Sequence, residues 1–101
     1  MKLIASELEV ISHYLQDKPV VRAFIFGSYA RGDADSRSDL DLLVELDYSR
    51  PIGLQFVGMK FDLEERLNKA VDLVSANGLS SRIRPFIDQH KQLIYERSVR
   101  R

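Results

Sequence analysis

The chain has 101 residues, of which 45% are hydrophobic and 30% charged, with 15 Lys and Arg residues against 15 Asp and Glu residues. This length suits one compact domain over residues 1–101, and the balanced charge gives no bulk attraction to nucleic acid or to an anionic membrane. The lack of cysteine excludes a disulfide framework and a thiolate metal site. Because no apolar run could span a bilayer and the N-terminal segment carries acids, we expect a cytoplasmic protein.

The first half of the chain predicts one helix followed by two strands. The helix covers residues 3–16, and its apolar residues recur at helical spacing: Ile4, Leu8, Ile11 and Leu15. Residues 20–26 are apolar except for Arg22, which indicates a strand that is buried on both faces and lies at the centre of a sheet. A polar turn over residues 27–38 leads to a second strand over about 39–46.

A second long helix is predicted to begin near Pro51, and it carries two apolar stripes. The stripe that would face the core contains Ile52, Phe56, Met59, Leu63 and Leu67. The second stripe lies on the nearly opposite side and contains Leu54, Val57 and Phe61. A surface helix needs only one apolar stripe, so the second must pack on another helix of the domain, which we favour, or on another chain.

The last third of the chain predicts a short strand over residues 70–74 and a helix after the Asn77-Gly78 turn. Ser80 or Ser81 could cap this helix, which would bury Ile83, Phe86 and Ile87.

Residues 92–96 could either end that helix or form an edge strand. The arginines beyond them, Arg97, Arg100 and Arg101, are expected in a solvated tail. The predicted fold class is α/β, with a small mixed sheet of three or four strands and three or four helices.

The turn after the first strand has the chemistry of a phosphate cradle. Gly27 lacks the Cβ that would hold a phosphate away from the backbone, and Ser28 offers a hydroxyl and an N–H where a short helical turn could begin. Arg31 adds a planar cation suited to phosphate oxygens, although it could instead pair with Asp33 or Asp35.

Acidic residues open the second strand. Asp39 and Asp41 would share one face about 7 Å apart, since side chains alternate along a strand. Paired acids are often only a solvent-exposed face, but Asp72 is a third acid on a strand that is otherwise apolar, where an unpaired carboxylate is costly to bury. Three carboxylates opposite a phosphate cradle supply the oxygen ligands that Mg²⁺ takes together with substrate phosphates.

These residues also form a recognisable pattern. The spacing Gly27-Ser28-x-Ala30-Arg31-Gly32, five residues, then Ser38-Asp39-x-Asp41 resembles the signature of the minimal nucleotidyltransferases of the DNA polymerase β superfamily. The resemblance implies a palm-like core and the transfer of a nucleoside monophosphate, AMP by expectation, from an NTP to a hydroxyl. It also implies two Mg²⁺ ions held by Asp39, Asp41 and Asp72, with Gly27, Ser28 and Arg31 binding the phosphates.

From the length of the chain we expect no second domain for an acceptor, which would therefore have to bring its own binding surface. Family members that look like this chain are often antitoxins that add AMP to a tyrosine of a HEPN toxin, so the resemblance implies that role. Two alternatives stay open: a transferase that acts on a small molecule or nucleic acid with a separate subunit, and an antitoxin that neutralises its partner by contact alone. The base preference, the acceptor and the oligomeric state are not determined by the sequence.

Overall fold

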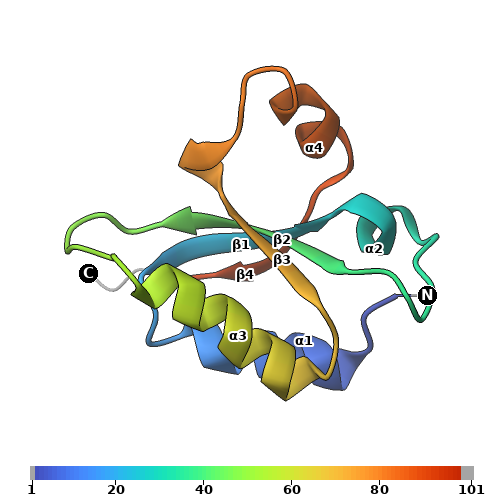
Figure 1. Cartoon of the computed structure of the whole chain (residues 1–101), viewed down its shortest axis with the longest axis horizontal. Coiled ribbons are helices and arrows are strands. Elements are labelled where there is room, and N and C mark those ends of the chain that lie inside the picture. The colour runs from blue at the N-terminus through green and yellow to red at the C-terminus, as the bar shows by residue number, and fades with distance from the viewer. Residues whose placement is uncertain (1, 99–101) are drawn as a thin grey trace.

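The computed structural model describes residues 2–98 and builds them around one sheet (Figure 1). In chain order the elements are α1 (Ala5–Leu15), β1 (Val20–Phe26), α2 (Gly27–Arg31), β2 (Leu40–Leu46), α3 (Gln55–Leu67), β3 (Val71–Ser75), the 3₁₀ turn η1 (Ala76–Gly78), α4 (Arg84–His90) and β4 (Gln92–Glu96). No helix in this range is long and apolar enough to cross a bilayer.

The sheet has the strand order β3-β2-β1-β4. β1 is a central strand that pairs antiparallel with β2 and β4, while β2 pairs parallel with β3. Parallel neighbours need a crossover connection, and α3 supplies it. The predicted mixed α/β fold class is therefore confirmed, and the open choice at residues 92–96 is resolved as a strand.

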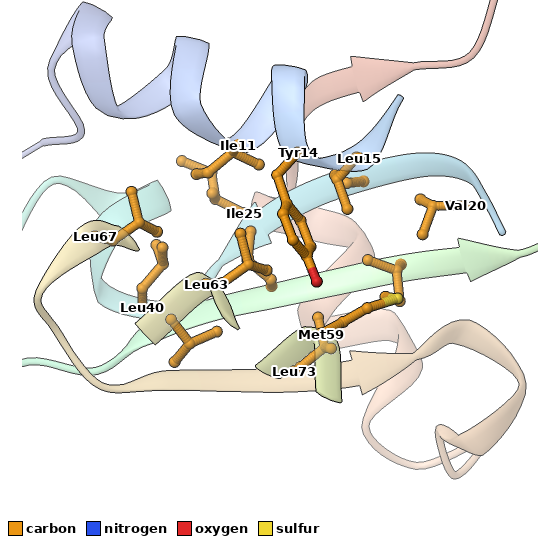
Figure 2. Close-up of a cluster of buried hydrophobic side chains, with 14 of the residues drawn as sticks. Ile11, Tyr14, Leu15, Val20, Ile25, Leu40, Met59, Leu63, Leu67 and Leu73 are labelled. Atoms are coloured by element: carbon orange, nitrogen blue, oxygen red, sulfur yellow. The ribbon is translucent and has the colours of Figure 1, made fainter. Parts of the chain in front are cut away.

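The main core lies between the sheet and the pair α1 and α3, which run side by side along one face (Figures 1 and 2). Alternate residues of β2 point into it, because side chains alternate along a strand. The largest side chains below 2% exposure are Ile11, Leu15, Val20, Leu40, Leu42, Val44, Met59 and Leu63. Most of the apolar faces predicted for α1 and for the first stripe of α3 thus belong to this core: Ile11, Leu15, Phe56, Met59, Leu63 and Leu67. Ile4 precedes α1 as its exposed N-cap residue, Ile52 precedes α3, and Leu8 is only half-buried.

One predicted helix start and two predicted burials are wrong. The helix expected near Pro51 begins at Gln55, because Gly53 takes a left-handed backbone conformation that interrupts a helix. In α4, Ile87 is buried as predicted, but Ile83 and Phe86 are exposed. This short helix stands on the sheet face opposite α1 and α3, and the ammonium of Lys91, 4.5 Å from the Phe24 ring centroid, already covers part of that face.

The second stripe of α3 is also not covered within the described chain. Leu54, Val57 and Phe61 are exposed, so the favoured interpretation, packing on another helix of this domain, is wrong. The reason is geometric: α1 and α3 share one face of the sheet, and each keeps an outer side that the other does not reach (Figure 1).

The chain end is anchored beyond β4. Arg97 donates through Nη1 to Asp47 Oδ2 at 2.7 Å and through Nη2 to the Lys18 carbonyl at 3.1 Å, and its backbone N–H donates to the Val21 carbonyl. The prediction of a solvated tail is therefore wrong for Arg97, while Arg100 and Arg101 lie outside the described residues. The bonds of Arg97 therefore join the segment after β4 to the end of β2 and to the start of β1.

We predict that Asp47→Asn makes folding stability less dependent on pH in acid. The hydrogen bond from Arg97 holds the pKa of Asp47 below its ordinary value of about 4. Ionised Asp47 therefore stabilises the fold above that pH, and the contribution is lost as the pH falls through the folded-state pKa. Urea unfolding at a series of pH values should show a deficit in the variant at pH 7 that shrinks below about pH 4.

The exposed substitution Glu9→Gln on α1 serves as the control and should follow the wild type. A deficit of the same size at pH 7 and pH 2 would show that Asp47 does not act through its charge.

Candidate active site

The junction of β1 and α2 brings the backbone against a carboxylate. Gly27 has a φ of 66°, and a Cβ added there would overlap the Oδ2 atom of Asp41. Asp41 lies opposite Phe26 in the antiparallel β1–β2 ladder, which carries its side chain to this turn. The space that glycine leaves open, expected for a phosphate, is thus shared with an acid.

The three predicted acids are brought to one end of the sheet. Asp41 and Asp72 are direct partners in the parallel β2–β3 ladder, where neighbouring strands lie about 4.8 Å apart. Asp39 immediately precedes β2, two residues before Asp41 and therefore on the same face. Since Leu40 and Leu42 are in the main core, the acids lie on the face opposite α1 and α3.

The pKa of Asp41 depends on the charges of the other acids and of Arg31. Its pKa is raised, first by burial and then by the negative charges of Asp72 and Asp39, while the positive charge of Arg31 opposes the shift. Like charges held together disfavour the ionised form unless a cation joins them. The site therefore combines three acids and one arginine.

Arg31 has two electrostatic neighbours. Its Nε lies 3.3 Å from Asp33 Oδ2 in an exposed ion pair, which is the alternative that the sequence left open. The same guanidinium acts on the pKa of Asp41. Arg31 is therefore close enough to act on Asp41, but its ion pair is with Asp33.

The short helix α2, which begins at Gly27 of the predicted phosphate cradle, is anchored by contacts that the sequence did not predict. Tyr29 is 3% exposed, and Lys69 donates to its hydroxyl at 3.1 Å. Lys69 also pairs with Glu7 of α1 at 2.7 Å, so one ammonium joins α1, α2 and the α3–β3 turn. Nothing in the local sequence marks this contact, because Lys69 and Tyr29 are 40 residues apart.

The turn before Asp39 is held by its own side chains. Asp35 Oδ1 accepts from the Arg37 backbone N–H at 2.8 Å, and Ser38 Oγ accepts from the Asp35 N–H at 2.9 Å. Such side chain to backbone bonds fix a turn locally. Ser38 and Asp35 therefore set the path by which the chain reaches Asp39.

No closed metal cage is present. Within residues 2–98, no three His, Cys, Asp or Glu side chains already surround a common point at which a metal ion would fit. Asp41 and Asp72 are neighbours in the β2–β3 ladder, but the side chains of the three acids do not converge on such a point.

We predict that Gly27→Ala destabilises the fold more than Gly53→Ala. Both glycines have positive φ, a conformation that costs a residue with a Cβ about 1–2 kcal/mol. Only at Gly27 must the new methyl also displace the Asp41 carboxylate, because nothing lies within 4 Å of a Cβ at Gly53. Urea unfolding of both variants measures the difference, and equal losses would contradict the close approach of Asp41.

Two relatives set the extent of the likeness. Over 60 residues, or 59% of its length, the chain is 45% identical to a protein of Methanocaldococcus jannaschii that is provisionally named a protein adenylyltransferase, and the match spans 63% of that relative. A second protein of the same organism with the same provisional name is 34% identical over 101 residues, covering 94% of this chain and 99% of its own length.

Solved structures share the fold. A protein described as a minimal nucleotidyltransferase superposes with a TM-score of 0.75 at 36% identity, over 86% of this chain and 88% of its own. The MNT antitoxin in complex with the tri-AMPylated Shewanella oneidensis HEPN toxin superposes with a TM-score of 0.69 at 18% identity, over 90% and 71%. The latter likeness shows the fold alone.

The family model described as polymerase beta, nucleotidyltransferase, matches residues 9–100. This range includes the Gly27 turn and all three acids. The chain therefore belongs to the polymerase beta nucleotidyltransferase family.

Proposed function

We propose that this chain transfers AMP from ATP to a hydroxyl of a partner protein and releases pyrophosphate. The observation that carries the proposal is the electrostatic coupling of Asp41 to Asp39, Asp72 and Arg31 beside the Gly27 turn. In a member of the nucleotidyltransferase family, acids in this position would take part in the transfer reaction. A structural role alone gives no reason to place three repelling carboxylates together.

The donor set fits Mg²⁺. This ion prefers carboxylate oxygens, keeps several waters and binds through one or two carboxylates together with substrate phosphates. Within residues 2–98 the acids alone do not surround a metal position. A metal ion that takes its remaining ligands from nucleotide phosphates and water does not require that they do. Asp39, Asp41 and Asp72 would hold the metal, which when bound would offset the charge of the phosphates and of the departing pyrophosphate.

The residues of the chain have distinct parts in this reaction. The backbone and hydroxyl at Gly27 and Ser28 would bind the β- and γ-phosphates at the start of α2, and Arg31 would add positive charge. A carboxylate oxygen of Asp72, the exposed member of the ladder pair, would take the proton of the acceptor hydroxyl. The acceptor oxygen then bonds to the α-phosphorus as the bond from that phosphorus to the pyrophosphate oxygen breaks.

A tyrosine of a HEPN-type toxin is the acceptor that we propose. The support is the AMPylated toxin bound to a protein of the same fold, together with the adenylyltransferase names of the relatives. A transferase that uses a small molecule or nucleic acid with a separate subunit is the second candidate, and a binder without catalysis is the third. The cytoplasmic location stays a prediction.

Replacing Asp39 and Asp41 together with Asn should abolish Mg²⁺-dependent ATP binding. The amides keep the shape but remove the charges that a divalent ion requires. Calorimetric titration with ATP, with and without Mg²⁺, measures the effect, and Asp88→Asn on α4 is the matched surface control. ATP binding that needs no metal and survives the double substitution would contradict the site.

Asp72→Asn should lower kcat for AMP transfer about 10²–10⁴-fold while the protein stays folded. Asp72 itself is exposed, and the buried neighbours Val71 and Leu73 supply the core contacts of β3. The rate is measured with a purified HEPN-type toxin, the acceptor proposed above, and the unfolding midpoint controls for stability. A variant with the wild-type rate would show that Asp72 is only a surface acid.

A further inference from the structure

The outer side of α3 is an apolar stripe that no other helix or strand in residues 2–98 covers, although the ammonium of Lys60 in the same helix lies 5.1 Å from the Phe61 ring centroid. Leu54, at the N-cap position, is 87% exposed, and Val57 and Phe61 are 48% and 59% exposed. Gly58 lies among them, and a Cβ there would meet nothing within 4 Å. A glycine inside a helix is destabilising relative to alanine, and no contact within the described chain requires it here. We name Leu54, Val57, Gly58 and Phe61 the α3 stripe.

An opposite charge lies at each end of the α3 stripe. Arg50 is exposed in the turn that leads into α3, and Glu65 is exposed in its last turn. Neither side chain has an ion-pair partner within the described residues. Glu65 is also unfavourable for its own helix, since an anion in the last turn opposes the macrodipole.

The order of these residues is self-complementary when reversed. If two α3 helices pack antiparallel about a point between residues 57 and 58, Leu54 of one lies near Phe61 of the other, and Val57 lies near Gly58. The same symmetry brings Glu65 of the second copy to the N-terminal end of α3, next to the turn that contains Arg50. Glu65 then lies near the N-terminal end of the other helix, where a negative charge is favourable, which removes the conflict within the single chain.

We propose that a second copy of this chain covers the α3 stripe in a two-fold symmetric dimer. Such an interface is isologous, so the same patch serves both copies. The missing Cβ of Gly58 lets the two helices approach closely, and the large side chains Leu54 and Phe61 bury one another. The pairing depends on apolar contact at the centre and on ionic contact at both ends.

This interface leaves the candidate active site accessible. The acids lie on the sheet face opposite α1 and α3, whereas the α3 stripe faces away from the sheet on the helical side. The dimer proposal therefore does not rest on the proposed function, and a toxin could reach each copy independently.

A charge-reversal series tests the proposal on the full chain. Sedimentation velocity over a wide range of protein concentration should show a monomer–dimer equilibrium for the wild type. Glu65→Arg and Arg50→Glu should each weaken the dimer at least tenfold, because each places like charges opposite one another. The double variant with both changes should restore it, since both pairs then again have opposite sign.

Apolar variants give the matched comparison. Leu54→Lys with Phe61→Lys should give a folded monomer by circular dichroism, whereas Phe86→Lys, an equally exposed apolar site on α4, should leave the dimer intact. A wild type that stays monomeric at all concentrations overturns the proposal. So does a dimer that survives the lysine variants, or a double charge reversal that fails to restore association. Loss of binding to a helical toxin by the lysine variants, with a wild type that is monomeric alone, would assign the stripe to that partner instead.

Discussion

The contact of the Asp41 carboxylate with the backbone at Gly27 is the constraint around which the site is built. It requires a residue without a Cβ at a positive φ, a strand that ends at this point, and a second strand whose register brings Asp41 opposite Phe26. If any of these changed, the acid would lose its place beside the cradle. Burial there and the neighbouring charges of Asp72 and Asp39 raise the pKa of Asp41.

The sheet divides stability from chemistry by its two faces. One face packs against α1 and α3 and contains the fully buried aliphatic residues (Figure 2). The other face carries the acids and is only partly covered by α4. Since successive residues of β2 point to opposite faces, Leu40 and Leu42 anchor the strand while Asp39 and Asp41 remain available to a ligand.

Two basic residues outside the core hold separate segments together. Lys69 joins Glu7 and Tyr29 and so fixes the position of the short cradle helix, which has too few hydrogen bonds to be stable alone. Arg97 secures the last strand against Asp47. The outer side of α3, by contrast, is left apolar and uncovered in residues 2–98, and its charges are arranged for an antiparallel copy rather than for its own chain.

The sequence by itself determined the features that depend on local chemistry. The apolar run Val20–Phe26 specifies β1 with the bounds that the structure has. The Gly27 turn with the spacing of Asp39, Asp41 and Asp72 indicates the family and predicts the candidate site. The start of α3 was misplaced by local reasoning too, because Gly53 takes a conformation that a list of helix formers does not reveal.

Only the tertiary structure decided which surfaces meet. Whether residues 92–96 would be strand or helix depended on the free edge of β1, and whether the α3 stripe would be buried depended on α1 and α3 sharing one face. The contacts of Lys69 with Tyr29 and of Arg97 with Asp47 join residues 40 and 50 positions apart. Periodicity and motif spacing record what each segment does by itself, whereas these contacts depend on how distant segments are placed against one another.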